Sequence, residues 1–388
     1  MKNRKLIIFG MAMLATSCMV VPKAQADNWM SRLDDNAYVM QLSIPGTHDA
    51  ATGDGFEWGA FADAFGKTQE LSLAEQWAAG VRAFDLRPSV VDDDLVICHG
   101  ILTTNTRFAD ALRLISDSLK ANPSETAIIL MRHESDNGSS LSTWKQLTTE
   151  LLNSDEVRAM VVDFKPRLTL GDVRGKMLIA SRDAYDSTPV GAFITNWSHS
   201  ASFDNQKNAR IRGPQSGTTT TLYAQDYYDL TATNGLKKKT DAIKALLDFS
   251  TRVHQRSILS NVWIINHCSG YTVSASTDGI RECAATTNRL VADYLADEAH
   301  WGPTGIVMMD FAGIDRSGDY EVAGAALLQA IIDNYFRYEA MSAGIEVTER
   351  EKNATPSATY DLLGRKLSEH GRQQQGIVIS NGKKHLAR

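Results

Sequence analysis

Short apolar runs alternate along this chain with segments of helical periodicity, and each apolar run ends in polar residues. Eight runs rich in Val, Ile, Leu and Met predict strands at residues 38–49, 81–87, 95–100, 126–134, 176–183, 222–228, 262–267 and 305–313. Apolar residues spaced three and four apart predict helices at residues 107–122, 238–255 and 286–300. Alternating strands and helices, with polar residues at the carboxyl ends of the strands, favour a TIM-type barrel.

The segment between the second and third predicted strands departs from this pattern. Residues 88–94 are too few to hold the crossover helix that joins two parallel strands, so they predict a local hairpin. The fold we expect is therefore α/β, an irregular TIM (β/α)8-type barrel. The segment ends in Asp92, Asp93 and Asp94. We interpret these aspartates as a solvated hairpin turn rather than as a calcium site.

The first 26 residues have the pattern of a signal peptide. Basic residues precede an apolar run, and Ala-Gln-Ala stands directly before Asp27, as a cleavage site requires. We therefore expect an exported protein that is secreted, periplasmic or on the cell surface. The alternative is a lipoprotein modified at Cys18. No later apolar run approaches the roughly 20 residues that a membrane-spanning helix requires.

The composition changes near the C-terminus. Residues 27–340 form the predicted body, and the polar residues 341–356, poor in aromatic side chains, predict a linker. Residues 357–388 hold two alternating strand-like segments, the second with an Asn-Gly turn signal, and predict a small C-terminal β appendage. This tail resembles the sorting domains of exported proteins of some Gram-negative bacteria. An accessory hairpin without a sorting role is the alternative.

Charge and cysteine content narrow the function classes. The formal net charge is −6, and because both ends of the chain are basic, the body between them is more acidic still. An acidic body argues against nucleic acid as a partner and against bulk electrostatic adsorption to anionic membranes.

Beyond Cys18 the cysteines are Cys98, Cys268 and Cys283, an odd number that allows at most one disulfide. Cys268 and Cys283 could close a loop, whereas we expect Cys98 to pack as a small buried side chain.

Candidate chemistry gathers at the predicted strand ends, and it differs from that of the familiar hydrolases. The chain has no G-x-S-x-G, H-E-x-x-H or P-loop motif. Four strand ends instead carry His48 with Asp49, Asp85 with Arg87, His99, and Asp310. Two histidines around a cation suit in-line phosphoryl transfer, because one imidazole removes a proton from the attacking hydroxyl and the other protonates the leaving oxygen. A guanidinium holds the phosphoryl oxygens, and a carboxylate behind the base fixes its tautomer.

Several motifs make a resemblance to a known family specific. The stretches "SIPGTHDAATG", "GVRAFDLR", "ICHG", "NPSETAIILMRHE" and "GIVMMDF" occur in order, and with them roughly residues 29–335 resemble bacterial phosphatidylinositol-specific phospholipase C. The resemblance implies cleavage of phosphatidylinositol to diacylglycerol and inositol 1,2-cyclic phosphate, with the inositol 2-hydroxyl as nucleophile. It implies the following catalytic roles: His48 as general base, Asp310 as its hydrogen-bonded carboxylate, His99 as general acid, Asp49 as the carboxylate that assists the acid, and Arg87 as the phosphate ligand.

The same resemblance implies a substrate-binding set. The inositol contacts of the family fall on Arg132, Arg182, Asp226 and Tyr228, with Tyr228 stacked beneath the ring. Arg132 departs from the family, since well-known members have lysine there, and guanidinium and ammonium differ in reach and geometry. Animal relatives hold calcium at several of these strand ends. Because Arg87 and Arg132 occupy positions of such ligands, we expect no cofactor and metal-independent catalysis.

Three questions stay open at the level of sequence. Trp58 and Phe61 are candidates for contact with a membrane surface, and ordinary core packing is the alternative. The lipid substrate could be phosphatidylinositol or a glycosylphosphatidylinositol anchor. We expect the protein to be a monomer without an obligate protein partner. Two other functions compete: a metal-dependent glycerophosphodiester phosphodiesterase, whose glutamate-rich metal site has no counterpart beside His48, and a non-catalytic inositol-phosphate or glycan-binding protein, which would be expected to lose one of the two histidines.

Overall fold

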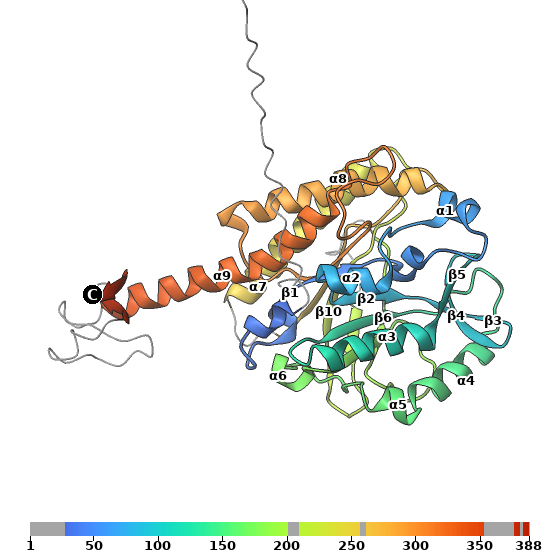
Figure 1. The fold of residues 1–388 in the computed structure, drawn as a ribbon, viewed down its shortest axis with the longest axis horizontal. Coiled ribbons are helices and arrows are strands. Elements are labelled where there is room, and N and C mark those ends of the chain that lie inside the picture. Colours follow the sequence, from blue (N-terminus) through green and yellow to red (C-terminus); the bar gives the residue numbers. More distant parts are fainter. Residues whose placement is uncertain (1–27, 201–208, 257–260, 353–375, 381–382, 388) are drawn as a thin grey trace, which may run out of the picture.

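The computed structural model describes residues 28–200, 209–256, 261–352, 376–380 and 383–387 (Figure 1). The predicted signal peptide and Cys18 lie outside the described residues, as does the first strand-like segment of the predicted tail. No helix in the described ranges combines the length and the apolar character needed to cross a bilayer.

Nine strands close a barrel in the described part of the chain. In spatial order they are β1 (Ser43–Thr47), β12 (Gly305–Met309), β11 (Trp263–His267), β10 (Thr219–Gln225), β9 (Ala209–Arg212), β8 (Ala192–Thr195), β7 (Met177–Ser181), β6 (Ala127–Met131) and β2 (Ala83–Leu86). All neighbours pair in parallel except β9, which is antiparallel to both β8 and β10. The predicted irregular TIM-type barrel is confirmed, and β9 is its principal irregularity.

The hairpin predicted at residues 88–94 is also confirmed. β3 (Pro88–Val91), β4 (Asp94–His99) and β5 (Leu102–Arg107) form a separate antiparallel sheet beside the barrel. Asp92 and Asp93 make the turn with positive φ angles of 49° and 59°, as a two-residue hairpin turn requires. The third predicted strand, at residues 95–100, therefore belongs to this side sheet and not to the barrel. In its place the barrel contains β8 and β9, which the apolar pattern does not predict.

The register between neighbouring barrel strands places the predicted polar residues at the same height along the barrel axis. Thr47 on β1 pairs with Met309 on β12 and with Phe84 on β2. The next residues along these three strands are His48, Asp310 and Asp85, so they emerge side by side at the carboxyl end. One level further, Leu86, Met131 and Ser181 are also in register across β2, β6 and β7. They are followed by Arg87, Arg132 and Arg182, which place three guanidinium groups on adjacent strand ends.

Helices pack around the outside of the barrel (Figure 1). They are α1 (Ala60–Gly66), α2 (Leu73–Ala79), α3 (Phe108–Ala121), α4 (Leu141–Leu152), α5 (Asp155–Arg158), α6 (Leu170–Val173), α7 (Gly235–Arg256), α8 (Thr277–Ala296) and α9 (Gly324–Lys352). Short 3-10 helices add η2 (Trp29–Arg32), η3 (Val39–Gln41), η4 (Ala50–Asp54) and η6 (Glu298–His300). The helices predicted at residues 107–122 and 238–255 are confirmed within a few residues. The third begins at Thr277, nine residues before its prediction, because Gly279 and the polar residues around it obscure the periodicity.

The three described cysteines are buried free thiols. Cys283 Sγ lies 3.6 Å from the backbone oxygen of Cys268, and burial raises the pKa of both thiols to about 12. The disulfide that the sequence allows between them is therefore not formed. Cys98 is buried as predicted.

The C-terminal helix α9 contributes its first half to the core. Leu327, Leu328, Ile331, Ile332 and Tyr335 are buried against the barrel, and α9 contacts both α8 and β1. The helical backbone continues to Lys352, through most of the segment predicted as a linker. β13 (Gly376–Ser380) and β14 (Lys383–Ala387) pair antiparallel on either side of the predicted Asn-Gly turn.

We expect a chain that ends near Met341 to remain folded and active, because the described core contacts of α9 come from residues before that point. Thermal unfolding and turnover of the truncated protein measure both properties. A shorter chain, ending near Ala323 and thus lacking α9, serves as the control and should not fold. Aggregation or loss of activity in the chain ending near Met341 would show that the tail is part of the body.

Candidate active site

A cavity of about 330 Å³ opens at the carboxyl end of the barrel. Its lining comes from residues that follow the barrel strands β1, β2, β6, β8, β10, β11 and β12, and from the side sheet, α1 and α8. Seven of the predicted site residues line it: His48, Arg87, His99, Arg132, Asp226, Tyr228 and Asp310. Asp49 and Arg182 lie directly behind them through ion pairs with Arg87 and Asp226. The structure thus brings the nine predicted catalytic and substrate-binding residues to one place.

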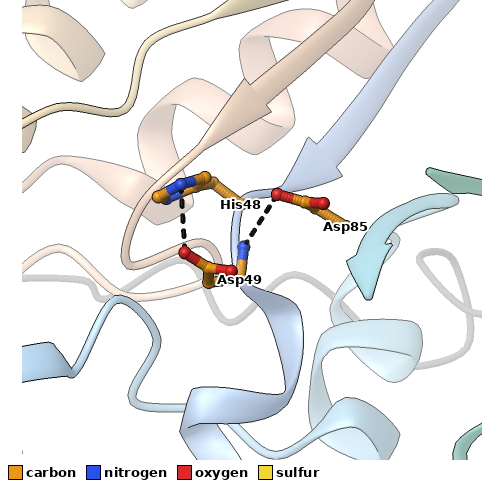
Figure 2. A group of neighbouring side chains, drawn as sticks. All are labelled: His48, Asp49 and Asp85. Carbon is orange, nitrogen blue, oxygen red and sulfur yellow. Dashed lines mark hydrogen bonds and ion pairs between the residues drawn. The ribbon is translucent and has the colours of Figure 1, made fainter. Parts of the chain in front are cut away.

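His48 lies between two carboxylates. Its Nδ1 is 2.8 Å from Asp310 Oδ1, and its Nε2 is 3.1 Å from Asp49 Oδ2 (Figure 2). Burial alone would lower the pKa of His48, but the negative charges of Asp49 and Asp310 outweigh burial and raise it above 6.5. The bond to Asp310 places the Nδ1 proton on the Asp310 side, so the free electron pair of the neutral ring lies on Nε2. His48 therefore has the geometry of a general base with a carboxylate partner.

The backbone after β1 turns sharply to place Asp49. Asp49 has φ 44° and ψ 53°, in the left-handed region that residues other than glycine seldom occupy. Thr68 Oγ1 is within hydrogen-bond distance of the carbonyls of His48 and Asp49, and Gln69 Nε2 donates to the carbonyl of His48. These bonds hold a strained turn at a polar site, and the turn places the Asp49 carboxylate beside the His48 ring.

Arg87 is the cation at the centre of a group of buried acids. Its Nε lies 2.8 Å from Asp49 Oδ1, its Nη2 lies 2.6 Å from Asp85 Oδ2, and its Nη1 lies 3.8 Å from Glu134 Oε2. Burial would raise the pKa of Asp85, but the adjacent Arg87 lowers it well below its usual range. His48, Asp49 and Asp85 have ligand-type atoms within 4.8 Å of one another (Figure 2). The Arg87 guanidinium already contacts both carboxylates of this group.

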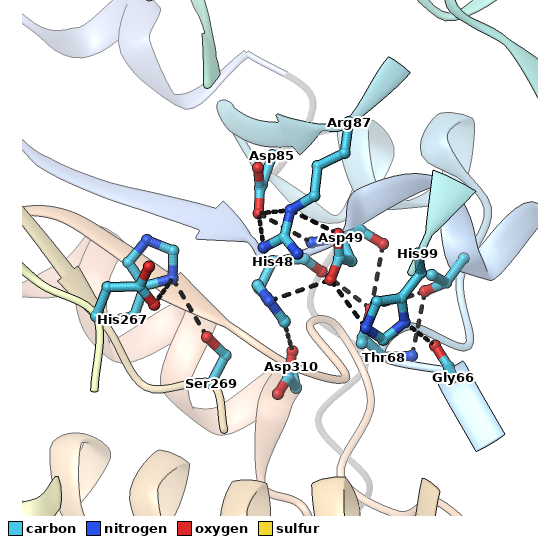
Figure 3. A network of polar contacts seen from close by, with 12 residues as sticks. His48, Asp49, Gly66, Thr68, Asp85, Arg87, His99, His267, Ser269 and Asp310 are labelled. Carbon is cyan, nitrogen blue, oxygen red and sulfur yellow. Dashed lines mark hydrogen bonds and ion pairs between the residues drawn. The ribbon is translucent and has the colours of Figure 1, made fainter. Parts of the chain in front are cut away.

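His99 approaches the same carboxylate from the side sheet. Its Nε2 lies 3.4 Å from Asp49 Oδ2, the oxygen that also contacts His48 Nε2, and the two imidazole rings are 6.4 Å apart (Figure 3). Its Nδ1 is 2.7 Å from the carbonyl oxygen of Gly66. The side chain is one-quarter exposed and faces the cavity. Two histidines thus face one space with Asp49 between them and Arg87 beside them.

The far end of the cavity is rich in donors and acceptors. Arg182 stacks on the ring of Trp197 and lies 3.7 Å from Asp226 Oδ2, which also accepts a hydrogen bond of 2.8 Å from Trp197 Nε1. Burial would raise the pKa of Asp226, but the hydrogen bond with His199 and the charge of Arg182 hold it well below its usual range. Tyr228 presents its ring at the cavity wall. Such alternating cations and carboxylates suit a polyhydroxylated ligand.

Three residues of this region carry no role in the sequence analysis. Glu134 is buried and lies 3.1 Å from Arg132; its position two residues after Arg132 at a strand end is a signal that could have identified it. His199 lines the cavity and lies 3.1 Å from Asp226. His267 is buried beside Asp226, and burial lowers its pKa to about 3, so it is uncharged. Nothing in the sequence distinguishes these two histidines from structural ones.

An exposed aromatic cluster lies at the rim. Trp58, Phe61 and Phe65 are 58%, 64% and 42% exposed, and adjacent rings are 6.4 and 5.0 Å apart. Phe56, in the same segment, is buried instead. Phe65 also lines the cavity, which places the cluster at its mouth. Core packing therefore does not explain Trp58 and Phe61.

Comparison with known proteins shows a similarity in the first half of the barrel. Residues 59–183 match the family "Phosphatidylinositol-specific phospholipase C, X domain". This segment of the chain is similar to the X domain of that family. The match begins just before α1 and ends after Arg182, so the matched segment includes Arg87, His99 and Arg132, whereas His48, Asp226 and Asp310 lie outside it.

Relatives and solved structures extend the X-domain match to the whole barrel. The chain is 29% identical to a 1-phosphatidylinositol phosphodiesterase of Listeria monocytogenes, over 73% of this chain and 80% of that protein. It is 25% identical to the protein of the same name from Staphylococcus aureus, over 75% of this chain and 90% of that protein. A phosphatidylinositol-specific phospholipase C structure from S. aureus superposes with a TM-score of 0.65 at 20% identity, covering 80% of this chain and 98% of that one. The structure of the L. monocytogenes phosphatidylinositol-specific phospholipase C superposes with a TM-score of 0.59 at 25% sequence identity. The superposition covers 80% of this chain and 98% of that one.

Proposed function

We propose that this protein is a phosphatidylinositol-specific phospholipase C that cleaves phosphatidylinositol to diacylglycerol and inositol 1,2-cyclic phosphate. The observation that carries the proposal is the pair of histidines, His48 and His99, whose Nε2 atoms both face Asp49 Oδ2 in one cavity beside a fixed guanidinium. This arrangement supplies a base, an acid and a phosphate ligand without an enzyme nucleophile.

The reaction follows from these positions. His48 Nε2 takes the proton of the inositol 2-hydroxyl, whose oxygen forms a bond to phosphorus. The bond between phosphorus and the diacylglycerol oxygen breaks, and His99 donates a proton to that oxygen. Arg87 binds the non-bridging phosphoryl oxygens, where negative charge is concentrated in the transition state. Asp310 stabilises the imidazolium that forms at His48, and Asp49 assists His99.

The inositol ring would occupy the far end of the cavity. Asp226 can accept hydrogen bonds from ring hydroxyls, while Arg132 and Arg182 can donate to them. Tyr228 would lie against a face of the ring. Since these groups surround the ring and not the lipid, the site itself is compatible with phosphatidylinositol and with glycosylated anchors. Phosphatidylinositol is the substrate that we propose, and an anchored protein serves as the comparison substrate in the assay.

The deciding experiment measures cyclic phosphate released from phosphatidylinositol in the presence of EDTA, with the product followed by phosphorus NMR. We expect full activity with the chelator, because Arg87 occupies the place of a metal between Asp49 and Asp85. Loss of activity with EDTA and its recovery with calcium would overturn the metal-independent mechanism. Release of glycerol 3-phosphate from glycerophosphodiesters, without cleavage of phosphatidylinositol, would favour the glycerophosphodiesterase alternative.

We further propose that Trp58 and Phe61 contact the lipid surface. Both side chains are mostly exposed at the mouth of the cavity, and large aromatic side chains partition well into the interfacial region of a bilayer. An acidic protein body gains little from electrostatic adsorption to anionic lipids, so apolar contacts would supply the binding free energy. In keeping with the predicted signal peptide, we propose that the enzyme acts outside the cytoplasm.

Trp58→Ala should impair cleavage of phosphatidylinositol in vesicles about tenfold, as expected for the loss of roughly 1.4 kcal/mol of membrane binding. Cleavage of a soluble, short-chain phosphatidylinositol below its micelle concentration should remain close to that of the unmodified protein. Leu141→Ala is a matched control, because Leu141 is 51% exposed at the start of α4 and does not line the cavity. Equal losses on both substrates would show that Trp58 acts through packing.

A further inference from the structure

Helix α1 has two faces with different surroundings. Outward, it carries the exposed rings of Phe61 and Phe65. Inward, Ala62 packs in a small buried cluster with Phe56 and with Leu102 of the side sheet. The helix ends at Gly66, which is buried and whose carbonyl oxygen is the partner of His99 Nδ1 at 2.7 Å. Gly66, the last residue of α1, therefore contacts the proposed general acid His99.

This contact determines which nitrogen of His99 carries a hydrogen when the ring is neutral. A carbonyl oxygen only accepts hydrogen bonds, so His99 Nδ1 must carry a hydrogen in this arrangement. The proton that His99 gives to the leaving oxygen must then come from Nε2, the nitrogen that faces Asp49 and the cavity. An imidazole free to rotate would present either nitrogen, and only one of these orientations would deliver a proton to the leaving oxygen.

The two proposed catalytic histidines differ in the charge of their Nδ1 partners. His48 has the Asp310 carboxylate, whereas His99 has the neutral carbonyl of Gly66. A carboxylate favours the protonated ring and suits a base that must hold a proton. A neutral carbonyl orients the ring without adding a full charge at Nδ1, which suits an acid that must release its proton. The difference in partner thus matches the difference in role.

The position of the Gly66 carbonyl is itself fixed by helix α8. The first residue of α8, Thr277, is buried; its hydroxyl accepts a hydrogen bond of 3.2 Å from Lys67 N and donates to the carbonyl of Asp63. This single hydroxyl therefore holds both sides of the last turn of α1. Gly66 also needs to lack a side chain, since a Cβ would lie 3.1 Å from His99 Nδ1 and 2.6 Å from Leu102 Cδ1.

We propose that the last turn of α1, through the carbonyl of Gly66 and its anchor Thr277, is the positioning element of the general acid His99. Proton transfer to the leaving group then depends on how this rim helix is seated, although α1 itself touches no reacting atom. The inference rests on the proposed function only for the role of His99. The orientation of the His99 ring by Gly66 can be tested separately.

The first test compares two leaving groups. Gly66→Ala should lower kcat about 100-fold on phosphatidylinositol, as a displacement of a catalytic group by around 1 Å can do. It should lose much less on an inositol phosphate with a phenolate leaving group, because a phenolate departs without a strong acid. Leu102→Ala, alone and combined with Gly66→Ala, removes the 2.6 Å contact and keeps the one with His99. If the double variant recovers full activity, the loss is one of packing and the proposal is wrong.

The second test leaves Gly66 unchanged. Thr277→Val keeps the shape of the buried side chain but removes the hydroxyl that anchors α1, and should give the same dependence on leaving group with a smaller loss. Thr287→Val is the matched control, a buried threonine on α8 whose hydroxyl bonds within α8 and to Cys268. Equal losses of Thr277→Val on both substrates would indicate a general structural role and contradict the proposal.

A spectroscopic readout is independent of activity. The Nδ1 proton of His99 should appear in nitrogen-15 NMR spectra as a protected imidazole N–H in the unmodified protein and in Thr287→Val. It should exchange rapidly in Gly66→Ala and Thr277→Val. A His99 with unchanged Nδ1–H protection in both of these variants overturns the proposal. Absence of phosphatidylinositol cleavage in the unmodified protein would instead overturn the proposed function and leave this readout intact.

Discussion

His99→Ala is expected to lose about 10³-fold in kcat/KM on phosphatidylinositol, the size of a general-acid contribution together with lost positioning. The diacylglycerol oxygen leaves as an alkoxide and needs a proton in the transition state. A phenolate needs far less help, so an inositol aryl phosphate should restore much of the activity of this variant. The measurement is kcat/KM on the two substrates for the same preparation.

His48→Ala provides the contrast. It should be as inactive as His99→Ala on phosphatidylinositol but should stay inactive on the aryl substrate, since the 2-hydroxyl must still be deprotonated whichever group leaves. Asp310→Asn, which removes the charge beside His48 Nδ1, should lower the pKa of His48 and move the acid limb of the pH profile to lower pH. If His48→Ala is the variant that the aryl leaving group rescues, the assignment of base and acid is reversed.

Arg87→Ala should produce the second large effect, a loss of about 10³-fold in kcat/KM that a phenolate leaving group does not rescue, because the phosphoryl oxygens carry charge with either substrate. It should also destabilise the fold by roughly 3 kcal/mol at neutral pH, since it leaves the buried carboxylates of Asp49, Asp85 and Glu134 without their shared cation. Without Arg87 the pKa of Asp85 rises. The destabilisation should therefore shrink as the pH falls and the carboxylates bind protons.

Arg82→Ala is the matched control for Arg87→Ala. Arg82 is buried and lies 2.9 Å from the buried Glu125, just before β2, at the opposite end of the strand from Arg87. This variant should lose stability to a similar degree but keep activity per folded molecule. Where the alanine variants do not fold, Arg87→Lys and Arg82→Lys give the same comparison. Equal losses of activity in the two positions would show that Arg87 acts only through the fold.

Hydrophobic pattern predicts most of the barrel because its strands are buried on both faces and end abruptly in charged residues. β1, β2, β6, β7 and β12 follow this pattern. β11 is also buried at every position, and β10 is buried at every second position before its buried end. The apolar pattern does not predict β8 and β9. In β9, Arg210 and Arg212 alternate with buried residues, and the strand pairs antiparallel with both neighbours. β4 carries the same apolar signal as a barrel strand, but only its pairing with β3 and β5 assigns it to the side sheet.

The catalytic candidates were accessible from the sequence because each stands at a strand end, whereas their supporting groups were not. Lys239 ends a run of three lysines, yet it is buried and its Nζ lies 3.2 Å from Gln225 Oε1, because the helical period turns it toward the barrel. The Gly66 carbonyl belongs to the backbone and has no sequence signal at all. Such contacts depend on how distant elements pack, and periodicity does not specify them.

The pairing of β1 with β12 has a consequence for when the enzyme becomes active. His48 follows the first barrel strand and Asp310 follows the last, 262 residues later in the chain. A chain that has not yet placed β12 has His48 without the carboxylate that orients it. Catalytic competence therefore requires the barrel to be closed between β1 and β12. Recovery of activity after denaturation should follow the docking of β12, and turnover can serve as a kinetic reporter of that step.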